Sequence, residues 1–351
     1  MIHHNPASIS NRLLVRALFS SLVLIMVMAC QPKQPDQTAS GSAAESTSSP
    51  QSVAASTWGD VKVQSLQGHT GKVWSVALSP DQQMLASAGN DKTIKVWNLQ
   101  TEQPNHVLQA HQDAVLSVAL SPDGQTLAST SKDKLIKLWS PQTGELKQTL
   151  QGHTKIVRSI VFAPDQKRLV SSSWDKTAKV WDLETGKVLH TLSGHQMGIF
   201  AVAISADGQT IATVSRDKTI KLWNAQTGEL LRTLTGHTDS VRCVAFSPAG
   251  GTLATGSNDK TIKLWDVNTG QLLHTFTGHT DLVNSVAFGP GGTMLVSGSQ
   301  DQTLKLWDMN AKTLIRTLQG QSGAIESVTV GSSGRMLASG NEDGTIKVWQ
   351  P

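Results

Sequence analysis

This chain of 351 residues has few cysteines and a small net charge. The two cysteines, Cys30 and Cys243, are too few for a disulfide scaffold. The 30 Lys and Arg residues are nearly balanced by 26 Asp and Glu residues, and Arg12 and Arg16 supply half of the net charge of +4. A nucleic-acid-binding surface needs a basic footprint, so no nucleic-acid partner is expected. Cys243 lies in an apolar stretch and is expected to be a buried free thiol.

Long apolar runs and the motifs of cofactor chemistry are missing as well. The run Ala17–Met28 has 12 residues, whereas a membrane-spanning helix needs about 20. We find no Gly-rich loop of the kind that cradles phosphates and no His or Cys spacing typical of a metal site. Paired acidic residues do not occur outside a repeated pattern described below. We therefore expect no cofactor, no metal and no enzymatic activity.

Residues 1–29 are typical of an export signal. Arg12 and Arg16 form a positive region, the apolar run follows, and Ala29 stands directly before Cys30. This order resembles a bacterial lipoprotein signal, in which a small residue precedes a cysteine that is acylated. The resemblance implies lipidation at Cys30, export, and attachment to a bacterial membrane on its periplasmic or outer-surface side. An ordinary signal peptide or an uncleaved anchor is the alternative.

Residues 30–57 have the composition of a tether. After Cys30 they consist mostly of Ser, Ala, Thr, Gln and Pro, with a single Val and no other large apolar side chain. Such a segment cannot bury a core and is predicted to be disordered. It would join a lipid to a folded body over about 30 Å; a glycosylated stalk is the alternative.

Residues 58–351 consist of one unit repeated seven times. A Trp recurs every 42 residues, at Trp97, Trp139, Trp181, Trp223, Trp265, Trp307 and Trp349. A fixed period of this length indicates an array of one supersecondary unit. Because such units stack on their neighbours, we expect 58–351 to form a single body.

Each copy has the pattern of four short strands. In the second copy these strands are expected at 107–108, 115–120, 126–131 and 135–139, separated by turn signals such as Pro122-Asp123-Gly124. Four strands in about 40–45 residues predict one blade of a β-propeller.

The two ends of the repeated region predict how the ring closes. The last copy ends at Pro351, directly after its third strand, and Gly59–Leu66 precedes the first copy. We expect Gly59–Leu66 to complete the last blade, because this pairing leaves no open sheet edge at the seam.

Four polar positions recur with the repeat, and in the fifth copy they are His237, Thr255, Asp259 and Trp265. The one exception is Gln321, which replaces the His of the seventh copy. On these positions, 58–351 resembles the WD-repeat family. The resemblance implies an all-β, seven-bladed propeller with four-stranded antiparallel blades, and a hydrogen-bonded network of the four side chains in each blade.

A hydroxyl, a His and an Asp are also the components of a nucleophilic triad. Seven copies of the same set, each accompanied by a Trp, favour a structural role instead. We therefore expect His237 and Asp259 variants to lose stability. Because Gln321 has no imidazole, we expect the blade that closes the ring to be held less firmly.

Two positions vary from copy to copy and are predicted to form a binding face: the fifth residue after the loop His and the residue before the turn Asp. Seven of these residues form an aromatic and basic crescent: Trp74, Lys132, Arg158, Trp174, Phe200, Arg216 and Arg242. Glu326 and Glu342 form an acidic sector opposite. Exposed Trp, Phe and Arg are enriched in binding hot spots.

We therefore expect a non-catalytic scaffold for protein–protein contacts, tethered to a membrane outside the cytoplasm. Its partners would be other proteins or peptide segments with acidic groups. The alternative is an extracytoplasmic sensor or binder of a small or anionic ligand at the propeller mouth. An enzyme would need a unique His, acid and Ser cluster in one blade, and the acidic sector supplies only carboxylates.

Overall fold

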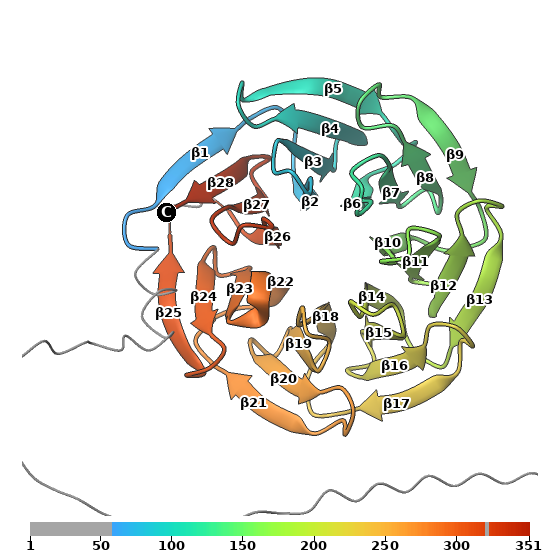
Figure 1. The fold of residues 1–351 in the computed structure, drawn as a ribbon, viewed down its shortest axis with the longest axis vertical. Coiled ribbons are helices and arrows are strands. Elements are labelled where there is room, and N and C mark those ends of the chain that lie inside the picture. Colours follow the sequence, from blue (N-terminus) through green and yellow to red (C-terminus); the bar gives the residue numbers. More distant parts are fainter. Residues whose placement is uncertain (1–57, 320–322) are drawn as a thin grey trace, which may run out of the picture. The chain divides into compact units, whose positions relative to one another are not determined.

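A computed structural model describes residues 58–319 and 323–351. The predicted signal (1–29), the predicted lipidation site Cys30, the tether (30–57) and Gln321 lie outside the described residues. The described residues form seven four-stranded antiparallel sheets around a central channel, which confirms the seven-bladed propeller (Figure 1).

The strands fall into four sets, ordered from the channel outward. The innermost strands are β2 (Val73–Leu78), β6 (Val115–Leu120), β10 (Val157–Phe162), β14 (Ile199–Ile204), β18 (Val241–Phe246), β22 (Val283–Phe288) and β26 (Ile325–Val330). The second strands are β3 (Met84–Gly89), β7 (Leu127–Ser131), β11 (Arg168–Ser173), β15 (Thr210–Ser215), β19 (Thr252–Ser257), β23 (Met294–Ser299) and β27 (Leu337–Asn341).

The third strands are β4 (Thr93–Asn98), β8 (Ile136–Trp139), β12 (Thr177–Asp182), β16 (Ile220–Asn224), β20 (Ile262–Asp266), β24 (Leu304–Asp308) and β28 (Ile346–Gln350). The outermost strands are β5 (Gln103–Gln109), β9 (Leu146–Leu150), β13 (Val188–Ser193), β17 (Leu230–Leu234), β21 (Leu272–Phe276), β25 (Thr313–Leu318) and β1 (Lys62–Leu66). Blades 1 to 6 are numbered in chain order from β2, and blade 7 is β26–β28 with β1.

The strands expected in the second copy are confirmed, with small shifts at their ends. β6 matches its predicted bounds, while β7 and β8 each begin one residue later than expected. The outermost strand β5 is longer than the predicted pair 107–108, because Gln103 and Pro104 already pair with β4.

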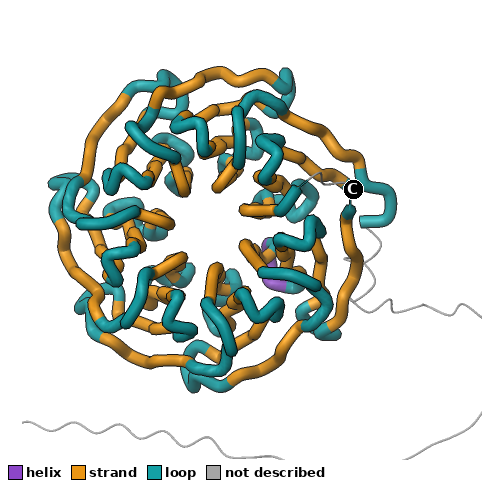
Figure 2. Tube along the Cα trace, turned by 180° about the vertical axis from the view of Figure 1, so that it is seen from behind, coloured by secondary structure: helices purple, strands orange, loops and turns teal. Residues whose placement is uncertain are grey.

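Short loops join the strands, and Figure 2 shows them from behind. Within 58–319 and 323–351 the one helix is a three-residue 3-10 turn, η1 (Pro290–Gly292). No helix in this part of the chain is both long and apolar enough to cross a membrane.

The ring closes as the sequence predicts. β1 pairs antiparallel with β28, from Lys62 opposite Gln350 to Leu66 opposite Ile346. Trp58, four residues before the start of this strand, is 2% exposed and packs into the core between blades 6 and 7. The first described residues are therefore part of the fold.

The core lies between neighbouring blades. Leu222 and Leu234 of blade 4, for example, belong to one buried cluster with Leu253 and Trp265 of blade 5. Since each blade is covered on both faces, its second strand is buried along most of its length, as in Thr252–Ser257. Burial of each Leu or Trp side chain stabilises the fold by about 2 kcal/mol or more.

A bulge recurs at the start of every innermost strand. In β18, Val241 pairs with Ser257 and Cys243 with Gly256, so Arg242 has no partner across the ladder. The register shifts at the same place in all seven innermost strands. A bulge turns its extra residue away from the regular alternation, and here it directs seven side chains toward the mouth of the channel.

Candidate binding surface

The four repeated polar side chains form one hydrogen-bonded chain, here called the structural tetrad. In blade 5, Trp265 Nε1 donates to Thr255 Oγ1 at 2.8 Å, and the Thr255 oxygen lies 2.8 Å from His237 Nε2. His237 Nδ1 lies 2.8 Å from Asp259 Oδ2. Asp259 also accepts the backbone N–H of Thr238 at 3.0 Å. The tetrad thus links the loop before the innermost strand to the turn after the second strand.

The surroundings of the tetrad hold its Asp ionised. Burial alone would raise the pKa of Asp259, but hydrogen bonds from His237 and Thr261 outweigh burial and hold this pKa well below its usual range. Hydrogen bonds from the loop His and from neighbouring groups likewise outweigh burial and lower the pKa of the turn Asp in the other blades that carry a loop His: Asp91, Asp133, Asp175, Asp217 and Asp301.

The tetrad is not arranged as a nucleophilic site. Thr255 is completely buried, and its oxygen already accepts the Trp265 indole N–H. A nucleophile must reach substrate and be activated by its base. The hydroxyl has no surface at which a substrate could approach it.

Blade 7 differs from the other six in its tetrad. Trp349 Nε1 lies 3.4 Å from Ser339 Oγ. In blades 1 to 6 the corresponding distance is 2.8–2.9 Å. A hydrogen bond of 3.4 Å is weaker than one of 2.8 Å.

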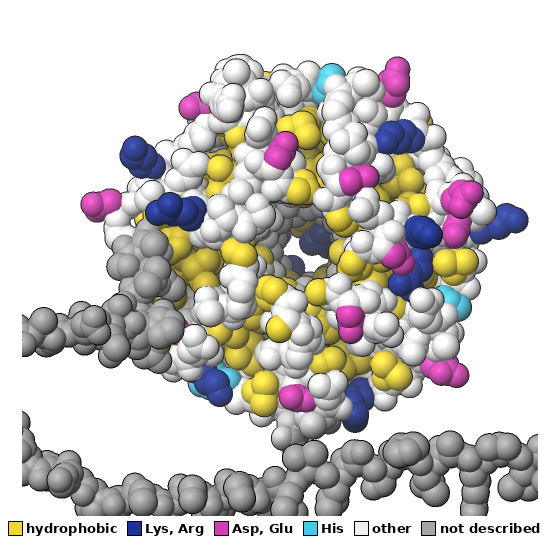
Figure 3. All heavy atoms as spheres, in the orientation of Figure 1, with side chains coloured by type: hydrophobic (Ala, Val, Ile, Leu, Met, Phe, Trp, Pro, Cys, Tyr) yellow, Lys and Arg dark blue, Asp and Glu magenta, His cyan; other side chains and the backbone are white. Residues whose placement is uncertain are grey.

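The seven bulge residues meet around the channel mouth, and we call them the channel residues: Trp74, Leu116, Arg158, Phe200, Arg242, Asn284 and Glu326. They line a hollow of about 160 Å³. Figure 3 shows the ring open at its centre, with Lys and Arg atoms in the wall of the opening. Four of the seven predicted binding residues lie in this wall.

A second, larger hollow opens on the loops of blades 3 to 5, and we call it the blade 3–5 pocket. Its volume is about 550 Å³. Its basic lining comes from Lys155, Lys176, Arg216 and Arg242, and its large apolar lining from Trp174, Met197 and Phe200. Among the described residues that line this pocket there is no carboxylate.

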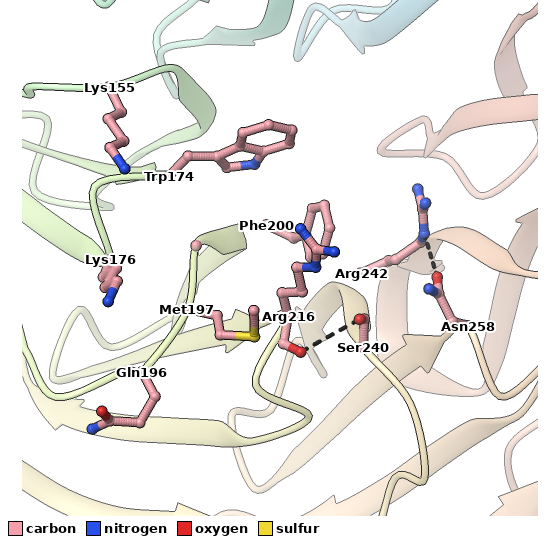
Figure 4. Close-up of a pocket in the computed structure, with 11 residues that line it drawn as sticks. Lys155, Trp174, Lys176, Gln196, Met197, Phe200, Arg216, Ser240, Arg242 and Asn258 are labelled. Carbon is pink, nitrogen blue, oxygen red and sulfur yellow. Dashed lines mark hydrogen bonds between the residues drawn. The ribbon is translucent and has the colours of Figure 1, made fainter.

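Two aromatic rings connect the pocket to the channel. Trp174, 43% exposed, meets Phe200 edge to face, with 6.4 Å between ring centroids. The Arg242 guanidinium lies over the other ring, 5.3 Å from the Phe200 centroid. Figure 4 shows Trp174, Met197, Phe200 and Arg216 around the same hollow. Phe200 and Arg242 therefore belong to both the pocket and the channel mouth.

The wall beside Trp174 is tightly fitted. A Cβ added at Gly198 would meet Trp174 Cδ1 at 3.1 Å and Trp174 Cα at 3.2 Å. Gly198 thus lets Trp174 approach the backbone of the neighbouring blade closely.

The structure divides the predicted binding residues into four groups, of which Phe200 and Arg242, shared by both hollows, are the first. Trp174 and Arg216 are exposed on the pocket, whereas Trp74 and Arg158 are half-buried in the channel wall. Lys132 lines neither hollow. The predicted crescent is thus divided between the pocket and the channel wall, because the bulges turn the first of the two variable positions toward the channel.

Lys155, Lys176 and Met197 line the pocket but were missed by the sequence analysis. Lys155 and Met197 occupy the second position after the loop His, where blades 2 and 5 carry Asp113 and Asp239. This variation between copies could have identified Lys155 and Met197 as candidate binding residues. At the position of Lys176 there is a Lys in five copies, so it was hidden among the constant residues.

The expected acidic sector is an ion-pair cluster at the seam. Lys72 Nζ of blade 1 lies 2.9 Å from Glu326 Oε1 and 3.1 Å from Glu342 Oε1, both of blade 7. The Glu326 side chain is 3% exposed. These carboxylates link the first and last blades, so they are not a free acidic surface.

Two other chemistries have no constellation of residues in the described parts of the chain. No group of three or more His, Cys, Asp and Glu side chains is placed to hold a metal ion in 58–319 and 323–351. The free thiol of Cys243 is buried, as expected, and burial raises its pKa to about 12. A thiol with so high a pKa is a poor nucleophile.

Comparison with family models covers most of the repeated region. The model described as "WD domain, G-beta repeat" matches residues 60–98, 102–140 and 144–182. The model described as "WDR3 first beta-propeller domain" matches residues 181–351.

Individual relatives match about one repeat each. A probable cytosolic iron-sulfur protein assembly protein, Ciao1, of Anopheles gambiae is 56% identical over 36 residues, or 10% of this chain and 11% of that protein. The guanine nucleotide-binding protein subunit beta of Nicotiana tabacum is 44% identical over 43 residues, 12% of each chain. The aligned part is about a tenth of the length of these relatives. The likeness therefore concerns the repeated unit.

Proposed function

Since the chain belongs to the WD40-repeat family of seven-bladed β-propellers, we propose that it is a non-catalytic scaffold that binds a segment of another protein in the blade 3–5 pocket. Propellers of this family typically act as platforms for protein contacts. The proposal adds to that general role a place on the ring and a chemistry for the segment.

The observation that carries the proposal is the uneven lining of the pocket. Four basic side chains and three large apolar ones face a hollow without a described carboxylate. No ion pair of Lys155, Lys176 or Arg216 occurs within the described residues. Uncompensated positive charge attracts and orients acidic groups, and exposed Trp and Arg are typical anchors. The fitting segment carries acidic residues beside one apolar anchor.

The test replaces Trp174→Ala and Arg216→Gln together and compares proteins retained from the native envelope. We expect the double variant to retain at least tenfold less of the proteins that bind the wild type. The matched control is Leu231→Ala with Arg232→Gln, which removes the same charge and similar apolar surface from exposed positions of strand β17. The same set of proteins on the double variant and the wild type would overturn the proposal.

We further propose that the propeller is exported and held on a bacterial membrane through acylated Cys30. The support is the order of residues 12–30 alone: two arginines, an apolar run, Ala29 and then Cys30. Two or more acyl chains would hold it durably, at about 0.8 kcal/mol per buried CH₂. Mass spectrometry of the mature N-terminus should find a lipid on Cys30, and Cys30→Ser should release the protein from membranes; an unmodified Cys30 would refute the anchor.

A further inference from the structure

Two residues at the mouth of the channel have hydrogen-bond donors without acceptors among the described residues. Arg158 has five N–H groups and makes one hydrogen bond to the described part of the chain, from Nη1 to the Leu116 carbonyl at 3.3 Å. The buried indole N–H of Trp74, in the same wall, has no acceptor among the described residues. Buried polar groups of this kind ordinarily have partners, so the two unsatisfied residues call for an acceptor.

The second arginine of the mouth is held in place but is not neutralised. Arg242 Nε donates to Asn258 Oδ1 at 2.5 Å, and Nη1 donates to Asn284 Oδ1 at 3.2 Å. Both partners are uncharged amides. They orient the guanidinium and leave its positive charge without a counterion.

The carboxylate in the channel wall forms no ion pair with either arginine among the described residues. Glu326 forms its ion pair with Lys72. Neither Arg158 nor Arg242 forms an ion pair with any residue of the described chain. Burial and the nearby charge of Arg242 together lower the pKa of Arg158 to about 10, although the attraction of Glu326 opposes them. Two like charges in a partly desolvated site are costly unless an anion joins them.

Both guanidiniums are backed by aromatic rings. Arg158 lies 5.1 Å from the Trp74 ring centroid and Arg242 lies 5.3 Å from that of Phe200. The rings fix the directions of the two groups, so they form a preorganised pair and need little reordering to bind.

We propose that the channel mouth is an anion site in which Arg158 and Arg242 together bind one carboxylate or phosphate group. The hollow of about 160 Å³ has room for such a group and not for a folded segment. The group can come from a free small anion or from an acidic side chain of the segment bound in the adjoining pocket. Only the second source rests on the proposed function.

The first experiment titrates inorganic phosphate and glutarate into the full-length protein at constant ionic strength, by calorimetry. Arg158→Gln is the test variant, because Arg158 lines the channel and not the pocket. We expect binding at least tenfold weaker than in the wild type. Arg232→Gln on strand β17 is the control and should leave binding unchanged.

The second experiment uses a hexapeptide of alternating Glu and Leu, and the same peptide with Gln in place of Glu. If the partner supplies the anion, the Glu peptide alone binds, and Arg158→Gln weakens it at least tenfold. If neither the small anions nor the peptide depends on Arg158, the channel site is overturned. Loss of peptide binding in the Trp174 and Arg216 double variant with no loss in Arg158→Gln would leave the proposed pocket standing and refute the channel site alone.

A third measurement separates binding from folding. Arg158→Met keeps an aliphatic side chain against Trp74 and removes the charge. Because that charge has no ion-pair partner among residues 58–319 and 323–351, we expect the melting temperature to equal or exceed that of the wild type. A fall of several degrees would mean that the fold itself needs the Arg158 charge, which contradicts a site held ready for an anion.

Discussion

The structural tetrads and the channel residues are two sets of polar side chains built from the same repeat, and they differ in how completely they are satisfied. In the tetrad of blade 5, each of His237, Thr255, Asp259 and Trp265 has a hydrogen-bond partner within the blade. At the channel mouth, one N–H group of Arg158 has an acceptor, and the Trp74 indole N–H has no acceptor among the described residues. The first set is complete without a ligand, and the second is not.

This difference separates residues that hold the ring from residues that are available to a partner. Buried hydrogen bonds to a charged group contribute about 1.5–3 kcal/mol each, so each of blades 1 to 6 gains from the same tetrad. A donor without an acceptor gains nothing in the free protein and can contribute only when a ligand arrives. The four predictions that follow test this division.

Acidification should have the largest effect, because the six Asp residues of these tetrads take up protons more readily in the unfolded chain than in the folded protein. The pKa of each turn Asp with a His partner is lower in the folded protein than its unfolded value of 3.8. The unfolded chain therefore binds more protons as the pH falls through about 4. Stability is full above about pH 5 and is lost progressively below it. Urea unfolding between pH 7 and pH 3 should show a fall of several kcal/mol, and a flat profile would contradict the role of the tetrads.

Removal of one tetrad carboxylate should be the next largest effect. Asp259→Ala leaves the buried His237 ring and the Thr238 and Thr261 backbone N–H groups without their acceptor. We expect the free energy of unfolding to fall by about 3–5 kcal/mol, measured by chemical denaturation. The exposed Asp60 makes a suitable control, and Asp60→Ala should leave the denaturation midpoint unchanged. If the two variants behaved alike, the tetrad would not be a stabilising element.

Blade 7 should show a smaller effect, because its tetrad is weaker. Its indole hydrogen bond is 3.4 Å long and the seventh copy carries Gln321 in place of His. Amide protons of strand β27 should exchange about tenfold faster than those of strand β19 in blade 5, by hydrogen-exchange mass spectrometry, as expected for about 1.4 kcal/mol less protection. Equal protection would show that β1 and the Lys72 ion pairs compensate fully.

The ring could be predicted from the sequence because the residues that define each blade lie close together in the chain and recur seven times. The spacing of Trp265 from its equivalents, the turn residues and the missing fourth strand of the last copy were enough to place the blades and the closing strand β1. No such repetition exists for a binding site, which occurs once. Its residues had to be inferred from differences between copies.

The bulge was the feature that the sequence did not reveal. A register shift of one residue at Val241 and Cys243 decides whether Arg242 points across the sheet or into the channel mouth. That shift depends on pairing with β19 and has no residue signature of its own in VRCVAF. The variable residues were therefore identified, but their division between pocket and channel required coordinates.

Variants of the blade 3–5 pocket should have the smallest effect on stability. Trp174 is 43% exposed and packs against Gly198 and Phe200 at the edge of the blade. We expect Trp174→Ala or Arg216→Gln to change the free energy of unfolding by no more than about 0.5 kcal/mol. The matched comparison is Trp265→Ala, which removes a buried Trp and should cost about 3–5 kcal/mol. If Trp174→Ala were as destabilising as Trp265→Ala, the ring at Trp174 would be part of the core, and its exposure would not be evidence of a partner.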